Sequence, residues 1–180
     1  MLLLAAPLII GAELVARPLM ILVAGKNFAP AGDILKILIL AVGFIFIGCL
    51  LAHAVIALDK QKNIIGAYIF TALTALLGYL IFIPRYSYYG AAWVTVYSEL
   101  AIAIFSLYIV IKYSQFKFNF IILFKSILAS LVMALFTYLL LNKLNLILLI
   151  PLASLIYLIC LYLFRAITRA DLKNLVANEQ

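Results

Sequence analysis

Six apolar stretches, each about long enough to cross a lipid bilayer, fill almost all of this 180-residue chain. The chain is 69% hydrophobic and 11% charged, and its mean hydropathy is +1.31. A soluble domain of this size has too little polar surface to cover so much apolar surface. Lipid accommodates such a composition when each span is a helix that satisfies its own backbone hydrogen bonds. The sequence therefore predicts an all-α, polytopic membrane helix bundle.

The predicted organisation is a six-helix transmembrane bundle over residues 1–164, followed by a polar cytoplasmic tail over residues 165–180. Charged turns, or turns that contain Gly or Pro, separate the spans. Asp33 is the predicted N-cap of the second span. The connections are short, so consecutive helices are expected to be antiparallel neighbours. The six predicted spans are Leu2–Ala24, Ile34–Leu58, Ile64–Ile83, Gly90–Ile111, Phe118–Leu141 and Leu144–Phe164.

Lysines and arginines are unevenly divided between the two predicted membrane surfaces. Because cytoplasmic loops carry an excess of these residues, both termini are predicted to lie in the cytoplasm of a plasma-membrane protein. The net charge of +7 is interpreted as this topology signal and as attraction to anionic lipid headgroups, and not as nucleic-acid binding. The predicted inner surface carries Lys60, Lys62, Lys112, Lys117, Arg165, Arg169 and Lys173, and the outer one carries Lys26, Arg85 and Lys143.

The sequence contains no pattern typical of a catalytic or metal site. It has one histidine, no Cys-x-x-Cys pair, no phosphate-binding glycine-rich loop and no HExxH or GxSxG motif. Cys49 and Cys160 both fall inside spans and predict no disulfide framework. We therefore expect no enzymatic activity, no cofactor and no metal. The function classes that remain are transport, membrane insertion and scaffolding.

Ionisable residues inside a span are costly, so each is a candidate functional residue. Glu13 and Arg17 lie four residues apart on one face of the first span. One interpretation is a mutual ion pair that lowers the cost of insertion. The other is that Arg17 faces a cavity and binds an anionic substrate group such as a phosphate, with Glu13 as its resting partner.

Two further candidates lie in the second and fourth spans. Glu99 has no charged neighbour at helical spacing and is a candidate for coupling transport to protons or to a cation. The alternative is a neutral carboxylic acid that is hydrogen-bonded to another helix, near Tyr97 or Ser98. His53 is interpreted as the donor or acceptor of an interhelical hydrogen bond, with a proton carrier as the alternative.

Small residues spaced four apart predict close contacts between helices. The second, third and fifth spans carry this pattern, which indicates packing and says nothing about a substrate. Prolines inside the first span are predicted to kink it. The small residues are Gly48 and Ala52, then Ala67, Thr71 and Ala75, then Ser126, Ser130 and Ala134; the prolines are Pro7 and Pro18.

Four segments together resemble the polysaccharide-transport branch of the MOP flippases, which export lipid-linked oligosaccharides. Two of them match a proline-led apolar stretch that runs into a turn of the form Gly-x-x-Phe. The third resembles the inner turn "Ala-Gly-Lys-x-Lys", and the fourth resembles the outer turn "Pro-x-Tyr-Gly-x-x-Gly-Ala-Ala". Thr95, Ser98 and Glu99 continue the fourth as the family's next helix often does. The segments are Ala6-Pro7-Leu8-Ile9-Ile10, Pro18-Leu19-Met20-Ile21-Leu22 with Gly25-Lys26-Asn27-Phe28, Ala57-Leu58-Asp59-Lys60-Gln61-Lys62, and Pro84 with Tyr88-Tyr89-Gly90-Ala91-Ala92.

The resemblance covers residues 1–115, and the last two spans match only in number and hydrophobicity. The sequence departs from the family at two turns. Asp59 stands where a glycine is usual, and the loop before Gly90 lacks the first of the usual glycines. These departures bear on the geometry of the turns.

The resemblance implies a fold of two six-helix lobes around a central cavity, of which this chain matches the C-terminal part. It implies a transporter portion that flips polyprenyl-pyrophosphate-linked oligosaccharide, with a missing N-terminal half or a second copy as partner. Arg17 would then help to neutralise the pyrophosphate, and Glu99 would respond to protonation or a cation. The alternatives are a non-transporting membrane scaffold and a membrane-embedded transferase subunit.

Overall fold

The computed structural model describes residues 2–114, 120–141 and 143–164, and the predicted tail over residues 165–180 lies outside them. The described residues are helical and contain no strand, as the all-α prediction requires. The elements are α1 (Leu2–Ala24), the short 3₁₀-helix η1 (Lys26–Phe28), α2 (Ala31–Ala57), α3 (Gln61–Tyr113), α4 (Phe120–Leu140) and α5 (Leu146–Leu163).

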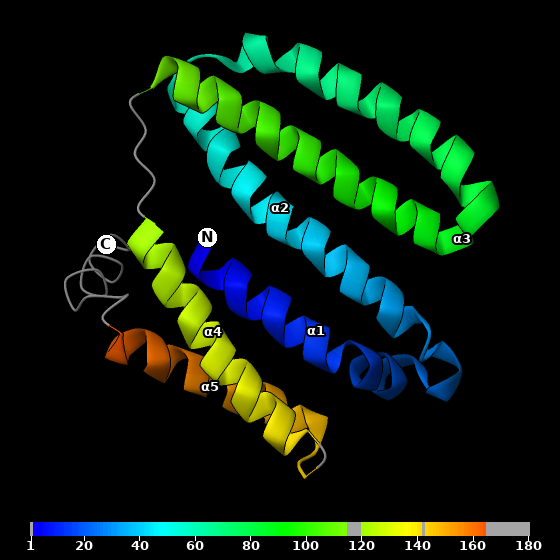
Figure 1. Cartoon of the computed structure of the whole chain (residues 1–180), viewed down its shortest axis with the longest axis vertical. Coiled ribbons are helices and arrows are strands. Elements are labelled where there is room, and N and C mark those ends of the chain that lie inside the picture. The colour runs from blue at the N-terminus through cyan, green and yellow to red at the C-terminus, as the bar shows by residue number, and fades with distance from the viewer. Residues whose placement is uncertain (1, 115–119, 142, 165–180) are drawn as a thin grey trace, which may run out of the picture.

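The third and fourth predicted spans form one element, because α3 runs for 53 residues and reverses its direction at Ser87 (Figure 1). A single residue outside helical backbone angles makes the reversal, so no loop separates the two arms, residues 61–86 and 88–113. The predicted count of six helices is therefore not confirmed. Among the described residues, α1, α2, α3 and α5 are long and apolar enough to cross a membrane, which is consistent with a multi-pass membrane protein.

Hydroxyl groups and one glycine hold the two arms of α3 together. The Tyr79 hydroxyl lies 3.0 Å from Thr95 Oγ1, and the Tyr97 hydroxyl donates to Thr74 Oγ1 at 3.2 Å. At the bend, a Cβ on Gly90 would lie 2.4 Å from the carbonyl oxygen of Phe82. Only glycine permits this approach between the arms.

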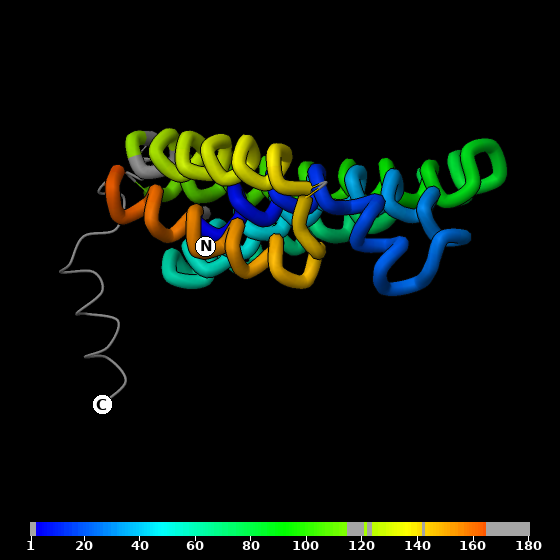
Figure 2. Tube along the Cα trace, turned by 90° about the horizontal axis from the view of Figure 1, so that it is seen from below, coloured from blue at the N-terminus to red at the C-terminus, as the bar shows by residue number. Residues whose placement is uncertain are grey.

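The helices follow one another as a row rather than around one shared core (Figure 1). Contacts run from α5 to α4, α1, α2 and α3, with a smaller contact between α1 and α5. Seen from below, this arrangement is a flattened slab (Figure 2). The helices of the row end on two opposite sides, the bend end and the lysine end (Figure 1). The bend end holds the α1–α2 connection and Ser87, and the lysine end holds the α2–α3 turn and Tyr113.

The α1–α2 connection also depends on a close approach of two backbones. A Cβ on Gly32 would lie 2.6 Å from the Cα of Arg17, so the first turn of α2 packs directly on α1. The prediction that Asp33 is the N-cap of this helix is wrong. Pro30 occupies the cap, and Asp33 lies inside the first turn of α2. Proline is favoured at helix starts because it has no N–H that needs an acceptor.

Large apolar side chains cover the outside of every helix. Examples are Leu8 on α1, Leu80 on α3, Leu135 on α4 and Leu163 on α5, which are 47%, 66%, 62% and 69% exposed. Exposing so much apolar surface to water is unfavourable, whereas contact with the acyl chains of lipids carries no such cost. The exposed side chains thus agree with the composition in placing the helices in hydrocarbon.

Candidate functional site

Arg17 and Asp33 form a bidentate ion pair at the bend end. Arg17 Nε donates to Asp33 Oδ1 and Arg17 Nη2 donates to Asp33 Oδ2, both at 2.8 Å. The parallel donors of a guanidinium match the two oxygens of a carboxylate, which makes this geometry strong and directional. The close packing at Gly32 brings the carboxylate within reach. The Arg17 side chain remains 61% exposed, so another anion has access to its guanidinium.

The predicted ion pair between Glu13 and Arg17 is wrong. Arg17 is paired with Asp33, and Glu13 makes no ion pair with any residue that the structure describes. Sequence spacing pointed to the helical neighbour, because residues four apart share a face. Tertiary packing places the Asp33 carboxylate of α2 where it accepts from both Nε and Nη2 of Arg17. A carboxylate on the same helix rarely accepts from both nitrogens.

Glu99 lies near the middle of the second arm of α3. It shares a face with the buried residues Val96, Ala103 and Ser106, and this face continues to Val110, which packs against Leu51 of α2. The Ser106 hydroxyl is buried and has no hydrogen-bond partner among the described residues. Glu99 is partly buried and makes no hydrogen bond or ion pair within the described residues.

The predicted neighbours of Glu99 are engaged elsewhere. The Tyr97 hydroxyl donates to Thr74 on the first arm, and the Ser98 hydroxyl donates to the carbonyl of Thr95 at 2.9 Å. The alternative of a carboxylic acid bound to a residue near Tyr97 or Ser98 therefore has no support from these contacts.

His53 bonds within its own helix. Its Nδ1 atom lies 2.7 Å from the carbonyl oxygen of Cys49, one turn earlier in α2. Because a carbonyl only accepts, Nδ1 carries the proton in this contact. The predicted interhelical hydrogen bond is wrong: the side chain is exposed, and a bond to its own helix competes with contacts to a neighbour.

The structure does not bring the four predicted residues into one site. Arg17 lies at the bend end, and His53 lies in the last turns of α2. The 20 residues from Asp33 to His53 span about 30 Å of helix. No group of three or more His, Cys, Asp or Glu side chains that could hold a metal ion occurs among the described residues. Within the part of the chain that the structure describes, these side chains therefore do not form a metal-binding cluster.

Sequence reasoning missed a cluster at the lysine end. Lys60 Nζ lies 5.0 Å from the centre of the Tyr113 ring, and Lys112 Nζ lies 5.5 Å from the same centre. Asn63 Nδ2 donates to the Tyr113 hydroxyl at 3.0 Å. The two lysines occur in different turns of the sequence, so only the reversal of α3 brings them to one ring.

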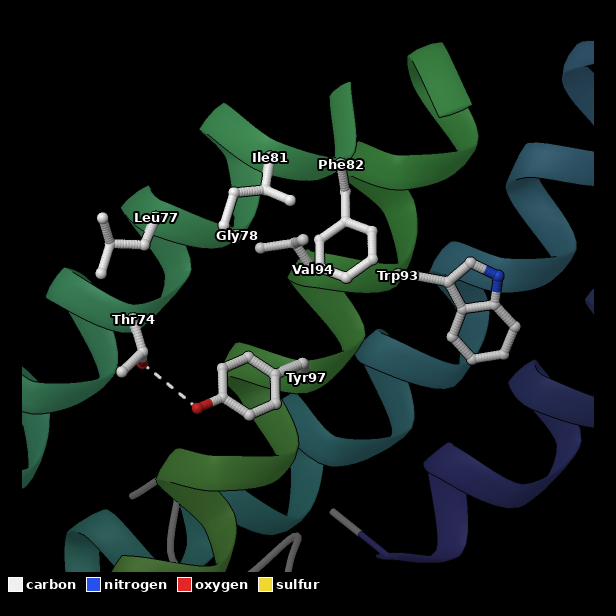
Figure 3. Close-up of a pocket in the computed structure, with 8 residues that line it drawn as sticks. All are labelled: Thr74, Leu77, Gly78, Ile81, Phe82, Trp93, Val94 and Tyr97. Atoms are coloured by element: carbon white, nitrogen blue, oxygen red, sulfur yellow. Dashed lines mark hydrogen bonds between the residues drawn. The ribbon is translucent and has the colours of Figure 1, made fainter. Parts of the chain in front are cut away.

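A groove of about 480 Å³ runs between the arms of α3 (Figure 3). Its two hydroxyls, those of Thr74 and Tyr97, bond to each other, as the dashed line shows. Apart from the indole N–H of Trp93, the rest of the lining is apolar, so the groove suits hydrocarbon. The groove is lined by Thr74, Leu77, Gly78, Ile81, Phe82, Trp93, Val94 and Tyr97.

Comparison of the chain with protein-family models, with curated proteins and with solved structures finds no match.

Proposed function

We propose that this chain is the C-terminal portion of a transporter that flips polyprenyl-pyrophosphate-linked oligosaccharide across the cytoplasmic membrane for surface polysaccharide export. The proposal rests on the resemblance of its turns to those of the MOP flippases. One structural observation supports it most: the backbone has a positive φ at both positions where the sequence departs from the family's glycines.

Asp59 occupies the glycine position of the inner turn, and its φ is 53°. The turn closes α2 with two hydrogen bonds, from Asp59 N–H to the Ile56 carbonyl and from Lys60 N–H to the Val55 carbonyl. This is the Schellman pattern of a helix C-terminus, in which the residue with positive φ is usually glycine. Aspartate tolerates this conformation better than most other residues, so the turn retains its geometry without the glycine.

The outer turn leads to the same inference. Counted back from Gly90, the family pattern places its first glycine at position 87, which Ser87 occupies. The backbone of Ser87 has φ 53° and ψ −134°, a combination that glycine adopts most readily. Asp59 and Ser87 are the two non-glycine residues with positive φ in the described part of the chain. Their coincidence with the family's two missing glycines supports the resemblance.

The arrangement of the helices suggests why a partner is needed. Alternating access requires one bundle to rock against another around a central site. The row of helices described above offers one wall with apolar side chains exposed on it. A separately encoded N-terminal half or a second copy of the chain would supply the other wall. The membrane lipid and the lipid-linked oligosaccharide are the further partners.

In the proposed orientation, with both termini in the cytoplasm, Arg17 lies toward the outer leaflet. Its resting partner is then Asp33, and the pyrophosphate of the substrate would displace that carboxylate as it arrives. Glu99, which has no partner among the described residues, would respond to protonation or to a cation during the cycle. Glu13 and His53 are weaker candidates, because Glu13 forms no ion pair within the described residues and His53 bonds to a carbonyl of its own helix.

Complementation tests the proposal. The chain would be co-expressed with a matching N-terminal half in a strain without its own flippase, and surface glycan would be measured together with membrane insertion of both halves. We expect glycan to be restored, and Arg17→Gln to reduce it strongly. Lys26→Gln is the matched control, because it removes an exposed cation at the same end.

Two outcomes would contradict the proposal. The first is no surface glycan although both halves are inserted. The second is full glycan with Arg17→Gln and Glu99→Gln, which would favour a scaffold that needs only the packing of its helices. Sugar transfer by the purified chain from a labelled donor would instead indicate the transferase subunit.

A further inference from the structure

The cluster at the lysine end suggests a binding site that is independent of the proposed transport. Lys60, Lys112 and Tyr113 come from the α2–α3 turn and from the last turn of α3. They meet because α3 reverses at Ser87 and returns to its own starting point. At the end of membrane-spanning helices, such a cluster lies at the depth of the lipid headgroups.

The two ammonium groups carry like charges and lie at 5.0 and 5.5 Å from one ring centre. Cation–π attraction offsets part of their mutual repulsion and does not neutralise it. No described carboxylate forms an ion pair with either lysine, and Asp59, next to Lys60 in sequence, forms none. Within the described residues, the cluster therefore lacks an anion that would balance it.

The adjacent helix start adds further donors. Lys60 is the N-cap residue of α3 and makes no side-chain capping hydrogen bond, and the first turn has no acidic residue. The first N–H groups of a helix, together with its dipole, attract an anion. These groups and the two ammonium groups thus favour the same kind of ligand.

The cluster is also organised before any ligand arrives. The hydrogen bond from Asn63 Nδ2 to the Tyr113 hydroxyl, at 3.0 Å, fixes the ring that both lysines contact. Lysine side chains lose much conformational freedom when they bind, and a fixed aromatic surface reduces that loss. Tyr113 is 40% exposed, so the site is open to the membrane surface.

We infer that Lys60, Lys112 and Tyr113, with the N-terminus of α3, form a binding site for a phosphate group, and that an anionic phospholipid headgroup supplies it. The phosphate oxygens accept from the two ammonium groups and from the first N–H groups of α3. A phosphatidylcholine headgroup carries its own cation, so it gains less from this site than phosphatidylglycerol does.

Native mass spectrometry of the full chain in detergent tests the inference, with phosphatidylglycerol or phosphatidylcholine added. We expect phosphatidylglycerol to be retained preferentially. Lys60→Gln and Lys112→Gln would each weaken its retention about fivefold, because each variant loses one ammonium contact to the bound phosphate. Tyr113→Leu would weaken it by a similar factor, because the lysines lose their shared support.

Lys62→Gln is the matched control, since it removes one cation from the same turn and Lys62 contacts neither the ring nor a described carboxylate. We expect less than about a twofold effect from this exposed charge. Equal losses in Lys62→Gln and Lys60→Gln, or no preference for phosphatidylglycerol in the unmodified chain, would overturn the site. Unchanged retention in Tyr113→Leu would overturn the role of the ring.

Inorganic phosphate distinguishes the source of the ligand. If millimolar phosphate releases the bound phosphatidylglycerol, the site recognises a soluble anion and the lipid assignment is wrong. If the lipid stays bound at the same ionic strength, the headgroup and its acyl chains are recognised together. None of these outcomes depends on restored transport, so the inference and the proposed function fail separately.

Discussion

Two regions of this molecule hold their helices together by different kinds of contact. In the region of α1, α2 and α3, backbones approach closely at Gly32 and Gly90. An apolar cluster that includes Leu51, Val55 and Val110 then joins α2 to both ends of α3. Here close approach comes first, because glycine lets one helix lie against the backbone of another, and the hydroxyl pairs between the arms of α3 add to it.

In the region of α4 and α5, hydroxyl groups make the decisive contacts. The Tyr157 hydroxyl donates to the carbonyl of Leu3, and the Ser126 hydroxyl lies 2.9 Å from the Tyr157 oxygen. Pro7 explains the first bond: it has no N–H, so the Leu3 carbonyl has no partner within α1. Tyr157 supplies the missing donor and thereby fastens α5 to α1.

The difference between these regions shows what replaces the hydrophobic effect inside a membrane. Lipid tails compete equally for apolar side chains, so apolar contact alone does not hold helices together. One region gains close van der Waals contact by having glycines at the crossings. The other gains hydrogen bonds where a proline has left a carbonyl unpaired.

The largest effect is expected from Gly90→Ala. The new Cβ would lie 2.4 Å from the Phe82 carbonyl oxygen, so the arms of α3 must separate. We expect a loss of about 3 kcal/mol in the free energy of unfolding, measured by denaturation in mixed micelles. Gly66→Ala is the control, because no atom lies within 4 Å of its added Cβ. This control is expected to stabilise the helix by about 0.5–1 kcal/mol. Equal stability of the two variants would refute the argument from close approach.

A smaller loss is expected from Tyr157→Phe. The ring stays in place, but the Leu3 carbonyl and the Ser126 hydroxyl lose their partner in a buried position. The expected cost is about 1–2 kcal/mol, read from the same denaturation experiment. Tyr138→Phe on α4, where the side chain is 65% exposed, provides the control. Restoring a donor to the Leu3 carbonyl by Pro7→Ala in the Tyr157→Phe background should recover part of the loss; no recovery would contradict the role given to Pro7.

The smallest effect, with the opposite sign, is expected from Ser87→Gly. Serine is strained at φ 53° and ψ −134°, whereas glycine adopts this conformation readily. We expect the variant to be more stable by about 0.5–1 kcal/mol. Ser114→Gly is the comparison: φ is −132° there, so glycine relieves no strain, and the variant loses the hydrogen bond from Ser114 Oγ to the Val110 carbonyl and is expected to be less stable. A destabilised Ser87→Gly variant would mean that the bend does not depend on this backbone conformation.

Local patterns were sufficient to predict the helical class and most of the helix bounds. α1 has the predicted bounds, and α2 begins three residues before its predicted start and ends one residue before its predicted end. The small residues Ser126 and Ser130 are fully buried, as their spacing predicted. Spacing does not reveal how a chain reverses, so the union of the third and fourth spans in α3 was not predicted.

The charged residues show where sequence reasoning stops. Spacing along α1 predicted Glu13 as the partner of Arg17. In the structure, the close packing at Gly32 places Asp33 of α2 beside Arg17 instead. The cluster around Tyr113 likewise needs two turns that lie 50 residues apart along the chain. Pairings of this kind depend on the relative position of helices, and no local pattern encodes that position.

The sequence by itself indicated a lipid environment and determined the helical class and most of the places where helices start and stop, because hydropathy, proline and glycine act over a few neighbouring residues. Only the tertiary structure decided which residues meet: Arg17 with Asp33, Tyr157 with the carbonyl that Pro7 leaves unpaired, and two lysines with one tyrosine. The physical reason is that these contacts form between helices, where crossing points and the reversal of α3 set the distances.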